Sequence, residues 1–155
     1  MTLNVNDSDT QNTLAIGGDG CQIGEAVTLN YGASPNPVTS RQWSSLITFA
    51  GVAQTFDMTN LAGLRGDVEN FSVVYLIYLY NLATATGYTL KVGNAVANPF
   101  SAFFDAATDV YTLPMGSRML FENHDTGWTV DATHKNLKLD PGANTFTAKI
   151  LIVGV

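Results

Sequence analysis

The chain is 155 residues long, with 46% hydrophobic residues, 13% charged residues and a formal net charge of −6. The length suits one domain, and the charged share lies well below the usual value of about 25%. The seven Lys and Arg residues form no basic patch, so neither nucleic-acid binding nor docking on an anionic membrane surface is expected, because both need clustered cations.

Residues 1–12 are polar and lack periodicity, and they predict a loose arm that is flexible or contacts a partner. They hold no basic region followed by an apolar core, so the sequence predicts no signal peptide. The charged residues among the first forty are all acidic: Asp7, Asp9, Asp19 and Glu25. Cys21 is the single cysteine, so a semi-buried thiol is favoured over an intermolecular bridge or a reactive thiol.

Short runs of alternating or β-branched and aromatic residues recur about every ten residues along the chain. We predict strands at 13–16, 26–31, 43–49, 54–58, 71–82, 88–92, 110–113, 117–122, 128–130, 136–140 and 145–153. Gly, Pro, Asn and Asp separate these runs, and no long stretch has a helical period. This spacing predicts an all-β protein in which residues 1–155 form a single antiparallel two-sheet sandwich, with a loose N-terminal arm.

The longest apolar run is Phe71–Leu82, which holds no Gly, Pro, Lys, Arg, Asp or Glu. Strict alternation places Val74, Leu76 and Tyr78 on one face and Ile77 with Leu79 on the other. Both faces are apolar, so we expect a central strand that is covered on both sides, by its own core and by a second layer or a partner. The run is too short for a membrane span, which needs about 20 apolar residues. The last strand also becomes apolar on both faces, and we expect the two strands to lie close together.

Three aromatic residues, Phe100, Phe103 and Phe104, lie within five positions directly after Pro99. They are costly to expose, so they either cap one end of the core or contact a partner, where aromatic residues are enriched. We take these three and Trp128 as candidate subunit or partner contacts. A sugar-stacking role for Trp43 or Trp128 is the alternative to burial.

No pattern in the sequence predicts a catalytic site, a metal site or a cofactor. His124, Asp131 and His134 are close in sequence, but solvated turn residues explain them better than a metal site. The segment Asn98–Asp109 lacks the regular Asp/Asn alternation of calcium loops. Arg65–Asp67 matches a cell-adhesion tripeptide, and a turn before the long strand is the simpler interpretation. The carboxylates that a hydrolase would need lie mostly in turns: Asp105, Asp109, Glu122, Asp125 and Asp131.

Several features of the second half of the chain form one pattern. They are the strand at 71–82, Leu90–Asn94, Asn98–Phe100, the turn Leu113–Gly116, Gly127–Val130 and the apolar ending Ile150–Val155. From about Asn70 onward the chain resembles small bacteriophage virion proteins of the single jelly-roll type. The resemblance implies a jelly-roll-like sandwich, a role in capsid decoration or as a tail or spike accessory, and a symmetric oligomer.

The sequence therefore predicts a non-enzymatic virion structural protein that associates with itself, with a trimer favoured, and binds capsid or tail proteins. It would assemble in the host cytoplasm and use burial of apolar surface, without a chemical step. The main alternative is a receptor- or carbohydrate-binding sandwich at a particle tip. A small hydrolase is a third candidate, which would need carboxylates or a His and a carboxylate to converge in one pocket.

Overall fold

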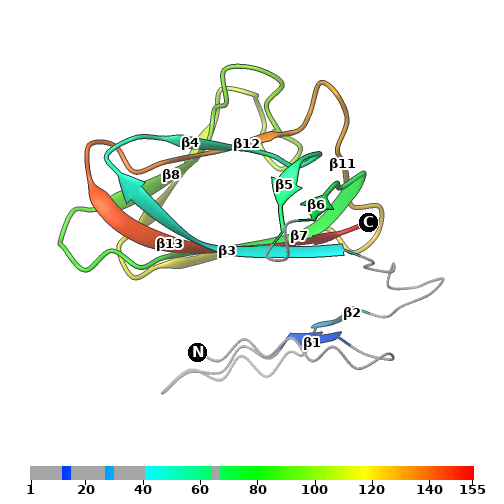
Figure 1. The fold of residues 1–155 in the computed structure, drawn as a ribbon, viewed down its shortest axis with the longest axis horizontal. Helices are drawn as coiled ribbons and strands as arrows, with labels where there is room; N and C mark the ends of the chain where they lie inside the picture. Colours follow the sequence, from blue (N-terminus) through cyan, green and yellow to red (C-terminus); the bar gives the residue numbers. More distant parts are fainter. Residues whose placement is uncertain (1–11, 15–26, 30–40, 64–66) are drawn as a thin grey trace.

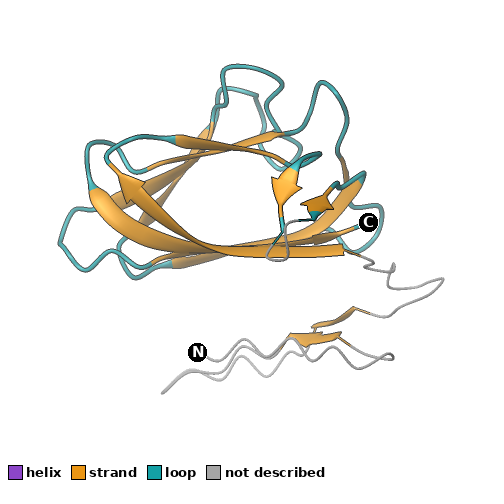
Figure 2. Cartoon of the chain, viewed as in Figure 1, coloured by secondary structure: helices purple, strands orange, loops and turns teal. Residues whose placement is uncertain are grey.

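The computed structural model describes residues 12–14, 27–29, 41–63 and 67–155, and no helix occurs among them. Figure 2 accordingly shows only strands and connecting loops. Eight strands form two antiparallel sheets that face each other (Figure 1). One sheet, here called the β7 sheet, has the order β10-β7-β13-β3, and the other, the β8 sheet, has the order β4-β12-β8-β9. The main strands are β3 (Arg41–Ala50), β4 (Gln54–Asp57), β7 (Val73–Asn81), β8 (Thr89–Gly93), β9 (Val110–Pro114), β10 (Arg118–Glu122), β12 (Asn136–Asp140) and β13 (Thr145–Gly154).

The chain crosses between the two sheets repeatedly, from β3 to β4, β7 to β8, β9 to β10 and β12 to β13. This strand order is that of a jelly roll, so the predicted all-β, jelly-roll-like sandwich is confirmed. The strand predicted at 43–49 forms part of β3.

Five short strands accompany the sandwich. They are β1 (Asn12–Leu14) and β2 (Val27–Leu29), which pair with each other, β5 (Leu61–Ala62) and β6 (Val68–Glu69), which also pair, and β11 (Trp128–Thr129), which extends the β7 sheet. The β5–β6 pair flanks the turn that the sequence predicts before the long strand, and residues 64–66 of that turn lie outside the described residues. Figure 1 draws β1 and β2 below the β7 sheet, on the side away from the β8 sheet.

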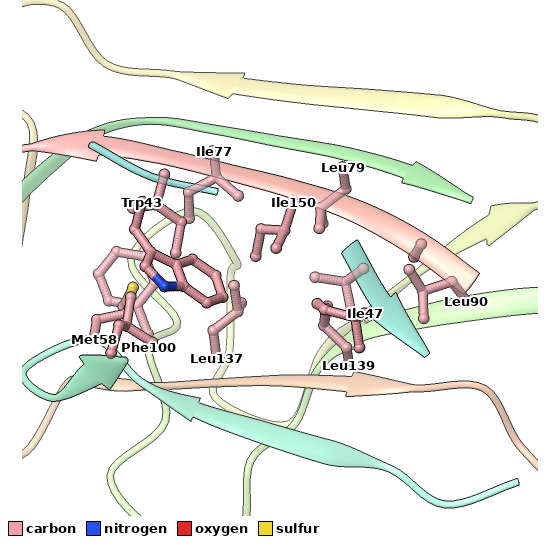
Figure 3. Packing of buried hydrophobic residues seen from close by; sticks show 14 of the residues in the cluster. Trp43, Ile47, Met58, Ile77, Leu79, Leu90, Phe100, Leu137, Leu139 and Ile150 are labelled. Carbon is pink, nitrogen blue, oxygen red and sulfur yellow. The ribbon is translucent and has the colours of Figure 1, made fainter. Parts of the chain in front are cut away.

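The main hydrophobic core lies between the two sheets, and its members alternate along each strand. Figure 3 shows Ile77, Leu79 and Ile150 of the β7 sheet facing Leu137 and Leu139 of the β8 sheet. All five are at most 2% exposed. Alternation of this kind follows from the pleat of a strand, and it places one side of each sheet in the core.

The pairing of β7 with β13 contains a bulge. Val153 lies opposite Leu76, but Gly154 lies opposite Val74, which leaves Tyr75 as an extra residue in β7. An extra residue in one strand reverses the in–out alternation beyond it.

The bulge decides which residues of β7 enter the core. Val74 faces the core with Ile77 and Leu79, whereas Leu76 and Tyr78 belong to a second apolar cluster on the outer face. The sequence-based prediction that Val74 shares a face with Leu76 and Tyr78 is therefore wrong, because it assumes strict alternation. The expected proximity of the two longest apolar strands is confirmed, since β7 and β13 are neighbours in register.

Asn81, at the end of β7, is a buried polar residue with 0% exposure. Its Nδ2 donates to the Leu113 carbonyl at 3.0 Å and to the Tyr88 carbonyl at 3.4 Å, and its Oδ1 accepts from the Ala83 N–H at 3.0 Å. Leu113 belongs to β9, so one amide side chain joins the two sheets. Buried polar groups that are fully hydrogen-bonded in this way are costly to disturb.

We expect Asn81→Asp to lower the free energy of unfolding by about 3 kcal/mol at neutral pH, because a buried carboxylate would face two carbonyl oxygens without a donor. Burial would raise the pKa of the introduced carboxyl. The folded state would then bind a proton more tightly than the unfolded state, and the loss would shrink as the pH falls. Urea unfolding at neutral and acidic pH measures this. Asn144→Asp, in a partly buried turn, is the control and should cost less than about 1 kcal/mol.

We expect Gly154→Ala to destabilise the protein by about 3 kcal/mol, because overpacking a close backbone contact forces the strands apart. A Cβ at Gly154 would lie 2.1 Å from the Val73 carbonyl oxygen. Gly116→Ala is the control: its Cβ would meet nothing within 4 Å, and only its φ of 69° is unfavourable, at a cost of about 1 kcal/mol. Equal unfolding midpoints for the two variants would contradict this account of the bulge.

Candidate partner-contact surface

The loop between β8 and β9 carries the three phenylalanines that the sequence singles out. Backbone hydrogen bonds hold it against the start of β12: the Phe100 N–H donates to the Asn136 carbonyl at 2.9 Å, and the Asn136 N–H donates to the Asn98 carbonyl at 2.9 Å. Asn98 has a φ of 47°, a left-handed conformation that Asn tolerates better than most residues. The loop therefore has a defined path that directs its aromatic side chains toward the sandwich.

Six aromatic residues from four parts of the chain pack together at one side of the sandwich, where the edge strands β9 and β10 follow each other. We call them the aromatic edge cluster: Phe100, Phe103, Phe104, Tyr111, Phe121 and Trp128. Phe103 is central, because its ring centroid lies 5.6 Å from Phe100, 4.4 Å from Phe104, 4.2 Å from Phe121 and 5.5 Å from Trp128.

Tyr111 connects this cluster to the edge strand of the β8 sheet. Its ring centroid lies 5.3 Å from Phe104 and 5.2 Å from Phe121. Aromatic pairs at such distances contribute about 0.5–1.5 kcal/mol each beyond the area they bury. The cluster thus joins β9 of one sheet to β10 of the other through side chains.

The cluster changes from buried to exposed across its width. Phe100 is 1% exposed, while Tyr111 is 43% exposed. Val110, at 41%, and Met115, at 40%, are further exposed apolar residues, one on β9 and one in the turn after it. We call Val110, Tyr111 and Met115 the β9 rim.

The β9 rim lies on an edge of the β8 sheet. Among the described strands β9 pairs only with β8, so its other side offers unpaired backbone groups. Exposed edge strands with apolar side chains favour association with another chain. Gly93 on β8 allows the loop to approach closely, since a Cβ there would lie 2.5 Å from the Asp109 carbonyl oxygen and 2.7 Å from the Phe104 ring.

The structure brings together all four residues that the sequence marks as candidate contacts. Phe103, Phe104 and Trp128 are partly buried and pack against the core. Phe100 is nearly fully buried, so it supports the surface from beneath and offers no area to a partner. Core capping therefore explains Phe100, and a partner contact through the other three stays a prediction.

The sequence did not mark Tyr111 and Phe121, which complete the cluster. Each is a single aromatic residue in an ordinary strand pattern, and they lie in different sheets. The crossing from β9 to β10 brings them together, and no short-range signal reports that crossing.

Trp43 occupies a different place from the surface position that sugar stacking would need. It is 7% exposed, lies in the main core and packs on Phe56 with ring centroids 5.7 Å apart. Its indole N–H donates to the Ala62 carbonyl at 2.9 Å. The buried alternative is therefore correct for Trp43.

The two histidines lie in separate polar contacts. His124 contacts Glu122, and His134 contacts Asp131 with a shortest distance of 3.1 Å. Hydrogen bonds from the Thr133 hydroxyl and N–H and from His134 hold the pKa of Asp131 well below its usual range. In the part of the chain that the structure describes, no three His, Cys, Asp or Glu residues gather as metal ligands would.

Some sequence-based predictions fall on residues that the structure does not describe: the arm up to residue 11, Cys21, and the tripeptide residues Arg65 and Gly66. Within the described ranges, no helix has the length and apolar character needed to cross a bilayer.

Comparison with known proteins adds little to this picture. No protein-family model matches the chain, and no curated protein matches its sequence. One solved structure is similar, described as "Bacillus endospore appendages form a novel family of disulfide-linked pili". It is 15% identical, the match covers 80% of this chain and 94% of that chain, and the TM-score is 0.41. Overlap at this level supports no argument about function.

We expect Phe103 and Phe121 to stabilise the fold cooperatively, because their rings stack at 4.2 Å. A double-mutant cycle with Phe103→Leu and Phe121→Leu, measured by urea unfolding, should give a coupling of about 0.5–1.5 kcal/mol. Phe103→Leu with Phe56→Leu is the control pair and should show coupling near zero, since Phe56 packs on Trp43 instead. Equal coupling in both pairs would contradict a cluster centred on Phe103.

Proposed function

We propose that this protein is a non-enzymatic structural protein of a virus particle, which associates with itself and binds a capsid shell or tail. The whole chain would act as one jelly-roll unit, and its contact surface would be the β9 rim together with Phe103, Phe104 and Trp128. The bacteriophage setting comes from the sequence resemblance, and the contact surface comes from the structure.

The observation that supports the proposal most directly is the β9 rim. Its three residues, each 40–43% exposed, belong to the unpaired edge strand and the turn after it, and the Tyr111 ring packs on Phe104 and Phe121. Exposed aromatic and Met side chains around a well-packed centre are typical of protein contacts. The low charged share of 13% agrees with this, because charged residues are depleted at the centre of such contacts.

The carbohydrate-binding alternative has less support from the aromatic residues. Trp43 is in the core, and Trp128 is partly buried with its ring edge-on to Phe103 at an interplanar angle of 62°. Jelly rolls occur both in capsid subunits and in lectin domains, so the fold itself admits either function. The exposed apolar strand edge is what favours assembly.

We expect the purified protein at about 50 μM to be an oligomer, with a native mass that corresponds to two or more chains of 16.6 kDa each. Light scattering after size-exclusion chromatography measures this mass. Tyr111→Ser combined with Met115→Ser should weaken association by about tenfold or more, because it removes apolar surface from the rim.

Val52→Ser provides the matched control. Val52 is 67% exposed, but it lies in the turn between β3 and β4, at the opposite side of the sandwich. This variant should associate like the unmodified protein. A monomer for the unmodified protein, or an unchanged mass for the Tyr111 and Met115 double variant, would contradict the proposal.

A further inference from the structure

A second apolar cluster lies on the outer face of the β7 sheet, on the side opposite the main core. We call Leu76, Tyr78, Leu151 and Val153 the outer cluster. The sheet register makes them neighbours, with Leu151 opposite Tyr78 and Val153 opposite Leu76. They therefore form one continuous apolar area over the two central strands, β7 and β13.

The outer cluster is buried to an extent that its own sheet does not explain. Its four residues are only 1–7% exposed. Among the described residues, the apolar side chains packed against it, Tyr80 and Leu120, lie on β7 and β10 of the same sheet. Neighbours on one sheet face shield each other from the side and leave the top open. Burial also raises the pKa of the Tyr78 hydroxyl, although nearby Arg118 opposes that effect.

One end of the outer cluster is basic. Tyr80 lies opposite both Arg118 of β10 and Lys149 of β13, and the Arg118 guanidinium lies 4.3 Å from the centre of the Tyr80 ring. The next residue across the sheet from Lys149 is Leu46, which is 60% exposed. At the other end, Glu122 is paired with His124. The face thus suits an occupant that brings apolar side chains and carboxylates to the end near Arg118 and Lys149.

The first forty residues of the chain meet these requirements in sequence. They hold four acidic residues and no Lys or Arg, and they include apolar runs such as Thr13–Ile16 and Ala26–Leu29. They also lead directly into Arg41, the first residue of β3, which is the edge strand of this same sheet. Figure 1 draws their two described strands, β1 and β2, on this side of the sheet.

We propose that residues 1–40 dock on the outer cluster of their own chain, with their apolar residues on β7 and β13 and their acidic residues near Arg118 and Lys149. The sandwich then has three layers, the third being contributed by the segment that precedes β3. This surface is separate from the β9 rim, so the proposal stands or falls independently of the proposed function.

A cross-linking experiment on the full chain tests which segment occupies the face. Native Cys21 is labelled with benzophenone maleimide and the protein is then irradiated. Mass spectrometry identifies the cross-linked peptides. The sample is an equal mixture of ¹⁴N- and ¹⁵N-labelled protein. We expect cross-links from Cys21 to peptides of β7, β10 or β13. Both peptides of each cross-linked pair should carry the same isotope, because they come from one chain. Mixed-isotope pairs would identify a second copy as the occupant, and absence of cross-links to these strands would exclude the segment; either result overturns the proposal.

A labelling experiment measures the cover itself. In a Cys21→Ser background, Leu151→Cys places a thiol in the outer cluster, and Ser44→Cys places one directly across the register on β3, where the residue is exposed. We expect the thiol at position 151 to react with a maleimide at least about tenfold more slowly than the one at position 44.

The acidic residues of the segment provide the specific control. Asp7→Asn, Asp9→Asn, Asp19→Asn and Glu25→Gln, introduced together, should speed labelling at position 151 by about threefold or more and leave position 44 unchanged, because they remove the attraction to Arg118 and Lys149. Equal rates at positions 151 and 44, or no response at position 151 to the charge changes, would overturn the proposal. A cooperative thermal unfolding transition for each thiol variant, with a midpoint above the labelling temperature, confirms that both remain folded.

Discussion

The pairing of β7 with β13 is the constraint on which the rest of the structure depends. Both strands are apolar on both faces where Leu76–Leu79 of β7 pair with Ile150–Val153 of β13, so neither is stable at an edge or with one side in water. Together they occupy the centre of the β7 sheet, with β10 on one side and β3 on the other. The second sheet can cover only one of their faces, and an apolar outer face follows directly from this geometry.

A single residue distributes the apolar side chains between these two faces. Tyr75 has no partner in the register with β13, and the bulge it creates sends Val74 inward while Leu76 stays outside. Gly154 makes the bulge sterically acceptable, because any side chain there would meet the Val73 backbone. The composition of the outer cluster is thus a consequence of backbone geometry as much as of hydrophobicity.

Aromatic side chains connect the two sheets at the side of the sandwich where β9 and β10 are the edge strands. The loop after β8 contributes Phe103 and Phe104, and rings from β9, β10 and β11 surround them. This packing leaves Tyr111 exposed on an edge strand that pairs, among the described strands, only with β8. The outer cluster and the β9 rim lie on different parts of the molecule. A segment of the same chain can therefore cover the outer cluster while the β9 rim stays accessible to another chain.

Local pattern alone determined much of this protein. Alternation and turn residues predicted the all-β class, most strand positions and the adjacency of the two longest apolar strands, because these depend on period-two burial within short segments. The grouping of Phe100, Phe103 and Phe104 was also visible, since they are close in sequence. Tertiary structure decided the remainder. The bulge at Tyr75, the burial of Phe100 and the contacts of Tyr111 and Phe121 all depend on how strands distant in sequence cross and pair. A register shift or a sheet crossing is set by the packing of the whole sandwich, and a local sequence pattern carries no record of it.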